Sequence, residues 1–371
     1  MQSILFFPLF LIYCSLFTFV GNKYKNYTKN LLIIIFISIF VFILGVRVNF
    51  GTDQETYLHM YFYQGADLLR CEKLYVLINQ FLRLLDAPYQ LLFALIAFLE
   101  IYFLVLTFEK ENVNVFWGFI LFFLIYINLY LNLSRQAIAM SFILFSIYFF
   151  SKKKYLSWII ISLIATGFHV SSVLSIFLIP VLNITKKIKI PKFIYYLIIC
   201  ILILFFDRLF DLIIDVFLMP LSLVFGEKLK IVTKVLDRKI PLGSGMGVRL
   251  RGIAYMCLLP LLLDYKNQNE KNNLYFTIFY FGLVGEFLSS VNMNLTRVFY
   301  YYSQLQLIIL PTVLININRK NLKKLKIKEI LFLMGLFFIF VLAVPKWING
   351  SDTTEFYRIS LNFDLFSNHS F

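Results

Sequence analysis

The sequence has few charged residues for its length. Charged side chains make up 15% of the 371 residues and hydrophobic side chains 60%, against about 25% and about 45–50% in soluble domains. A soluble domain of this length needs a polar surface that this composition does not supply. The composition therefore excludes an ordinary soluble protein and predicts an integral membrane protein.

Residues that bind metals or form disulfides are also scarce. The four cysteines are scattered and form no Cys-x-x-Cys pair, so neither a zinc site nor a disulfide framework is predicted. The sequence has no His and Glu cluster at metal-ligand spacing, no Asp-x-Asp pair and no Gly-x-Ser-x-Gly motif. These absences disfavour a metal-dependent nucleotide-sugar glycosyltransferase and a serine hydrolase. No metal and no cofactor are expected.

Long apolar runs dominate the chain. A run of about 20 residues crosses a hydrocarbon core roughly 30 Å thick, so we expect an all-α polytopic protein with about twelve transmembrane helices and residues 1–371 in one domain. The run 74–85 is too short to span and is expected to lie at the interface or to re-enter the membrane. The twelve candidate spans are 1–20, 31–46, 89–108, 115–131, 134–150, 155–168, 169–183, 192–206, 248–264, 274–290, 297–316 and 329–346.

Lysine clusters predict which loops face the cytoplasm, because positively charged short loops are retained there. With alternating spans, two long loops at about 47–73 and 207–247 face outward. The net charge of +15 then reflects membrane topology, and no nucleic-acid partner is expected. The dense clusters, all on one side, are 23–29, 152–154, 186–192 and 319–328.

Arginine has the opposite distribution. Ten of the eleven arginines fall on the outer side or at outer span ends, where the topology rule does not favour them. Arginine is the bidentate ligand of phosphate and diphosphate groups. The distribution therefore indicates an outward-facing site for such a group.

Two motifs in the N-terminal half combine arginine with other polar residues. In the first, Gly51 permits a tight turn that brings Arg47 and Asp53 to one rim of a cavity, although an ordinary polar loop has the same composition. In the second, Arg135 and Gln136 follow Asn132-Leu-Ser and start a helix. Free N–H groups and the helix dipole favour an anion there, and lipid headgroups are the alternative partner.

A third motif, Gly167-Phe-His169-Val-Ser171, lies at the outer tip of a predicted short hairpin. Imidazole titrates near neutrality, so His169 is suited to hydrogen-bond a diphosphate or to accept a proton from a sugar hydroxyl. A structural histidine that is merely hydrogen-bonded has the same pattern. The sequence leaves these roles open.

The C-terminal half contains two further motifs. A glycine-rich segment at 243–247, interpreted as a flexible gate, precedes Arg249 and Arg251, and Arg297 precedes a run of tyrosines that begins at Tyr300. Arg249 and Arg297 are both expected at outer span ends. The tyrosines are expected either to line a sugar path or to form the interfacial aromatic belt.

At these positions the sequence resembles the EpsG branch of the Wzy-type polysaccharide polymerases. The resemblance consists of Arg-x-x-x-Gly-Thr-Asp-x-x-x-Tyr at 47–57, Arg-Gln-x-x-Ala at 135–139, the following lysine cluster, and Phe-His-x-Ser at 168–171. It covers roughly residues 45–183. The C-terminal half agrees in its span pattern and in Arg297 with Tyr300.

The resemblance implies a membrane glycosyltransferase with a GT-C-like fold. Such an enzyme polymerises oligosaccharide repeat units linked to undecaprenyl diphosphate on the outer face of the bacterial cytoplasmic membrane, and it makes O-antigen, capsule or exopolysaccharide. Its expected partners are these substrates, membrane lipids, a chain-length regulator and a flippase. Asp53 and His169 are the expected catalytic residues, and the expected substrate-binding residues are Arg47, Gly51, Tyr57, Arg135, Gln136, Ser171, Arg249, Arg297 and Tyr300.

Two other functions fit the same features. A flippase for lipid-linked oligosaccharide also needs many spans and a cationic outer cavity, but the two related halves typical of many transporters are not visible in the sequence. A ligase that moves finished glycan to a different acceptor has the same chemical needs as a polymerase. The sequence does not separate the ligase from the polymerase.

Overall fold

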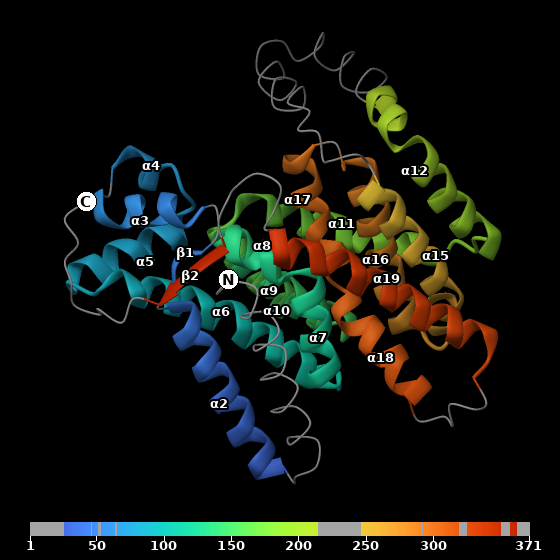
Figure 1. Cartoon of the computed structure of the whole chain (residues 1–371), viewed down its shortest axis with the longest axis horizontal. Coiled ribbons are helices and arrows are strands. Elements are labelled where there is room, and N and C mark those ends of the chain that lie inside the picture. The colour runs from blue at the N-terminus through green and yellow to red at the C-terminus, as the bar shows by residue number, and fades with distance from the viewer. Residues whose placement is uncertain are drawn as a thin grey trace. The chain divides into compact units, whose positions relative to one another are not determined.

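The structure is a computed structural model that describes residues 26–45, 47–50, 53–63, 65–213, 246–290, 292–318, 325–349 and 357–361. This part of the chain is almost entirely helical, which confirms the predicted all-α class (Figure 1). The strands described are β1 (Arg47–Phe50) and β2 (Tyr357–Leu361), which pair antiparallel. The predicted first span, 1–20, lies outside the described residues, as does most of the predicted loop 207–247.

The chain divides into two compact units, Met1–Ile176 with Ala343–Phe371 and Phe177–Leu342. This division is based on contacts alone and does not show whether the units are separate domains. The expectation of one polytopic domain therefore stays a prediction. The helices within the first unit are α2 (Asn26–Gly45), α3 (Gln54–Tyr63), α4 (Ala66–Leu69), α5 (Lys73–Leu84), α6 (Tyr89–Lys110), α7 (Val115–Ile125), α8 (Ile127–Asn132), α9 (Ser134–Ser151), α10 (Tyr155–Phe168) and the 3-10 turn η1 (Val170–Val173).

Helix α9 is the centre of the first unit. It packs against α6 and α10, while α2 packs against α6 and α5 against α10. Small residues such as Ala137, Ala139 and Ser141 are fully buried on α9, and Phe142 stacks with Phe103 and Phe168 at ring-centroid distances of 3.9 and 5.8 Å. Small and aromatic side chains together let α6 and α10 approach α9 closely.

The second unit is a separate group of packed helices. Helices α12, α15 and α16 pack against one another, α17 packs against α16, and α18 packs against α15 and α16. Helix α12 is interrupted at Phe205, where the backbone leaves the helical region (φ −130°, ψ 15°). The helices are α12 (Lys192–Ile213), α15 (Met246–Lys266), α16 (Glu270–Leu288), α17 (Met293–Ser303) and α18 (Gln306–Asn318), and α11 (Leu174–Thr185) and α19 (Ile327–Asn349) contain residues of both units.

Among the described helices, α6 and α15 are long and apolar enough to cross a membrane. Helices α17 and α18 add a third candidate if the pair, bent by 42°, is one span. Shorter apolar helices cover 33–45, 155–168, 170–185 and 192–205. The prediction of about twelve spans therefore stays a prediction, with two or three candidates in the described residues.

The short run 74–85 forms α5, a helix of 12 residues. Tyr75, Asn79 and Leu82 are buried on one side, whereas Leu77 and Phe81 on the other side are exposed. A short helix with an exposed apolar face is suited to lie in a membrane interface. Glu72, the N-cap residue of α5, belongs to the site described below.

Gly282 marks a close approach of α16 to the backbone of α17. A Cβ atom at this position would lie 2.3 Å from the backbone nitrogen of Ser303, and backbone does not yield as a flexible side chain does. We expect Gly282→Ala to lower the stability of the protein by about 1–3 kcal/mol, the usual cost of overpacking. Thermal unfolding in detergent measures the effect.

Gly247 in the first turn of α15 provides the matched control for Gly282. A Cβ atom at Gly247 would meet no described atom within 4 Å. Gly247→Ala is therefore expected to leave the unfolding temperature nearly unchanged. Equal unfolding temperatures for the two variants would contradict the close helix contact.

Candidate functional site

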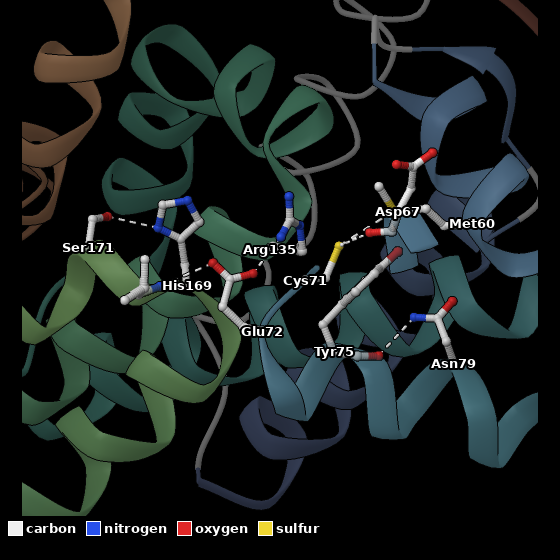
Figure 2. Close-up of polar contacts among 10 residues, drawn as sticks. Met60, Asp67, Cys71, Glu72, Tyr75, Asn79, Arg135, His169 and Ser171 are labelled. Atoms are coloured by element: carbon white, nitrogen blue, oxygen red, sulfur yellow. Dashed lines mark hydrogen bonds and ion pairs between the residues drawn. The ribbon is translucent and has the colours of Figure 1, made fainter. Parts of the chain in front are cut away.

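Three segments of the first unit meet at Glu72, which immediately precedes α5 (Figure 2). Arg135 at the start of α9 donates a hydrogen bond from Nη1 to Glu72 Oε2 and forms an ion pair with it. The other carboxylate oxygen, Oε1, accepts a hydrogen bond from the backbone N–H of Val170 at 3.1 Å. We call Glu72, Arg135, His169, Val170 and Ser171 the Glu72 cluster.

Local backbone structure explains why Glu72 and Arg135 are directed toward each other. Glu72 is the N-cap residue of α5 with extended backbone, but its side chain makes no capping hydrogen bond. Arg135 is the second residue of α9, whose N-cap residue, Leu133, has no side-chain hydrogen bond to offer. The first-turn N–H groups of α9, at the positive end of the helix dipole, therefore lie beside a guanidinium group, and this combination favours an anion.

The ion pair of the Glu72 cluster is mostly shielded from solvent, whereas Val170 is exposed. The Arg135 and Glu72 side chains are 25% and 16% exposed. The guanidinium carbon of Arg135 lies over the Tyr75 ring, 5.7 Å from its centroid, and the Tyr57 ring is 5.7 Å from the Tyr75 ring. An aromatic ring under a partly desolvated guanidinium stabilises its positive charge.

Tyr57 is buried next to this charge. Burial raises the pKa of its hydroxyl, and Arg135 opposes the rise through its positive charge and a hydrogen bond. The carboxylate of Asp53, one turn earlier, also raises this pKa. Tyr57 is therefore a neutral hydroxyl group beside Arg135.

His169 separates α10 from η1. Its backbone is extended (φ −154°, ψ 116°), and its N–H donates to the Ala165 carbonyl at 3.0 Å. The ring Nδ1 and the Ser171 Oγ share a hydrogen bond of 2.7 Å, whose direction depends on the histidine tautomer. The ring of His169 is thus oriented by Ser171, while the next peptide N–H is bound by Glu72.

The other predicted residues of the N-terminal half occupy different positions. Gln136 is buried beside Arg135 on α9, and Asp53 is partly exposed just before α3. Arg47 lies in β1, where it pairs with Leu361 of β2. Gly51 lies outside the described residues, so the predicted turn at this position is not tested.

The second unit contains another arginine–carboxylate pair. Arg251 of α15 forms an ion pair and a hydrogen bond with Glu286 of α16, whose side chain is 1% exposed. The guanidinium carbon of Arg251 lies 5.7 Å from the ring centroid of Tyr255, and the Tyr255 hydroxyl donates to Gln306 Oε1 at 2.5 Å. We call Arg251, Tyr255, Glu286 and Gln306 the Glu286 cluster.

Two predicted residues lie near the Glu286 cluster and one does not. The charges of Glu286, Arg251 and Arg297 all act on Tyr300, so Arg297 and Tyr300 of α17 belong to its surroundings. Arg249 is exposed on α15. Residues two positions apart on a helix point in different directions, which explains why Arg251 and not Arg249 meets Glu286.

Both carboxylates were missed by the sequence interpretation. Glu286 had a usable signal, because an acidic residue within a predicted span, here 274–290, marks a functional candidate. Glu72 had none, because in sequence it resembles other acids of the same loop such as Asp67, which is exposed and pairs with Arg70. Within the described ranges, no group of three or more His, Cys, Asp or Glu side chains is placed to hold a metal ion.

A family model described as the EpsG family matches residues 29–356 of the chain. The matched range includes the Glu72 cluster and the Glu286 cluster. No curated protein and no solved structure matches the chain. The resemblance inferred from the sequence motifs is thereby confirmed.

Proposed function

The chain belongs to the EpsG family, and from this premise we propose that it polymerises lipid-linked oligosaccharide repeat units. Family membership supports a role of the polysaccharide-polymerase type in general. Our finer proposal is a membrane glycosyltransferase whose donor and acceptor are carried by undecaprenyl diphosphate. It acts on the outer face of the bacterial cytoplasmic membrane, through a GT-C-like fold of about twelve spans.

The observation that carries this proposal is the pair of hydrogen bonds that Glu72 accepts, one from Arg135 and one from Val170 in the His169 turn. A guanidinium group offers paired N–H donors to a diphosphate, and the start of α9 adds the positive end of the helix dipole. The surroundings are poor in water, because Arg135 is only 25% exposed. Positive charge in such an environment stabilises the negative charge that develops on a departing diphosphate.

The reaction we propose is a displacement at the anomeric carbon of the donor sugar. The acceptor hydroxyl oxygen forms a bond to this carbon, and the bond from the carbon to the diphosphate oxygen breaks. Both electrons of that bond leave with the diphosphate, whose charge Arg135 stabilises. The proton of the acceptor hydroxyl passes to His169, because a ring held at Nδ1 by Ser171 has the fixed orientation that a general base needs. Asp53 is the second candidate for this proton.

Reconstitution tests the proposed function directly. The purified chain in liposomes, supplied with synthetic undecaprenyl-diphosphate-linked repeat units, is expected to give a ladder of longer carrier-linked glycans. Gel separation and mass spectrometry of the lipid extract measure the products. Transfer only to an acceptor without the carrier would indicate a ligase, and movement of the repeat across the bilayer without a new glycosidic bond would indicate a flippase.

A further inference from the structure

We infer that Glu72 is a positioning residue for glycosyl transfer, which holds the Arg135 guanidinium and the His169 turn in one fixed arrangement. The inference rests on the proposed function. Glu72 receives one hydrogen bond on each carboxylate oxygen, from Arg135 and from the N–H of Val170. These partners belong to α9 and to the turn after α10, so a single side chain connects the two groups assigned to the reaction.

The backbone position of Glu72 supports a role beyond its own helix. An acidic N-cap residue ordinarily stabilises the first turn of the helix that it starts. The Glu72 side chain makes no such bond and crosses instead to residues 63 and 98 positions later. A mostly buried carboxylate needs paired partners to offset its lost hydration, and the chain supplies a partner for each oxygen.

At Arg135, the contacts define the orientation of the guanidinium group. The Tyr75 ring lies on one side of the group, and the bond to Glu72 occupies Nη1. The Nε atom of Arg135 is buried and has no hydrogen-bond partner among the described atoms. The bond to Glu72 therefore holds one end of the guanidinium in place.

At His169, the effect of Glu72 passes through the backbone. The N–H of Val170 belongs to the peptide unit that follows His169, so the bond at 3.1 Å restricts the rotation of that unit. Ser171 restricts the ring itself through Nδ1. The two bonds together determine where the imidazole points, and an error of about 1 Å in such a position costs about 100-fold in rate.

This arrangement predicts a separation of turnover from binding. Glu72 carries a negative charge beside Arg135, so its removal does not weaken the attraction of the site for a diphosphate. Glu72→Gln is expected to lower kcat at least about 10-fold, while the Kd for undecaprenyl diphosphate is unchanged or lower. Glu72→Asp keeps the charge but is one methylene shorter, so it is also expected to lower kcat.

The experiment compares Glu72→Gln, Glu72→Asp and Asp67→Asn in the purified full-length chain. Asp67 is the matched control, because it is an exposed carboxylate in the same segment, and its variant should retain wild-type kcat. Steady-state elongation of lipid-linked repeats gives kcat and KM, a titration with undecaprenyl diphosphate gives Kd, and thermal unfolding reports the fold.

Two results would overturn the inference. The first is a kcat of Glu72→Gln within about twofold of the wild type. The second is a joint loss of kcat, undecaprenyl diphosphate binding and unfolding temperature, which indicates a purely structural ion pair. The wild-type chain separates this failure from failure of the proposed function, since a wild-type chain that elongates no glycan would refute the function itself.

Discussion

Arg135→Lys is expected to reduce polymerisation by about 100-fold or more, because it removes a fork of donors from the leaving diphosphate. A lysine ammonium is a single point of charge and cannot reproduce the parallel hydrogen bonds of a guanidinium to a diphosphate. It also cannot bind Glu72 and a diphosphate with the same geometry. The measurement is the rate of elongation of lipid-linked repeats by purified variants at equal protein level.

Arg70→Lys is the matched control for Arg135→Lys. Arg70 lies in the same segment as Glu72, but its side chain is 80% exposed and pairs only loosely with Asp67 at 3.7 Å. Exposed pairs of this kind contribute little, so Arg70→Lys is expected to retain full activity. Full activity of Arg135→Lys would refute a bidentate role for the guanidinium.

His169→Ala is expected to abolish transfer while the lipid-linked repeat still binds. A general base must be neutral to accept a proton, so wild-type activity should fall at acidic pH, where an imidazole is protonated. The residual activity of the alanine variant should lack this acidic limb. The measurements are pH profiles of kcat and a separate binding titration with the repeat unit.

The variant His169→Gln distinguishes a base from a hydrogen-bonding ligand. Glutamine donates and accepts hydrogen bonds but does not exchange the proton, so it is expected to remain inactive if His169 is the base. Recovery of both binding and transfer in His169→Gln would assign His169 to substrate binding instead. Asp53 would then be the next candidate to test as the base.

Most helix positions of this fold were predictable from apolar runs. The run 155–168 coincides with α10, and 134–150 differs from α9 by one residue. The break at Tyr126 between α7 and α8 was not predicted, because neither proline nor glycine interrupts the apolar run there. The bend between α17 and α18 was also missed, although Ser303, Gln304 and Gln306 interrupt the apolar run there.

The candidate site was predictable only in part. Arg135, His169 and Ser171 were predicted from their motifs, and the structure brings them together in the Glu72 cluster. The partner that connects them is a single glutamate in a loop, and tertiary packing alone distinguishes it from its acidic neighbours. Arg249 is exposed and Arg251 meets Glu286, a difference that the motif did not reveal, and the substrate-binding role of Arg249 stays a prediction.

The bonds of Glu72 also have a consequence for the order of biogenesis. The glutamate precedes Arg135 by 63 residues and Val170 by 98 residues. A ribosome that adds about 5–20 residues per second needs several further seconds to deliver both partners. Until then the Glu72 carboxylate lacks both of these partners. The Glu72 cluster therefore closes late, after α10 has been synthesised, and shorter nascent chains lack it.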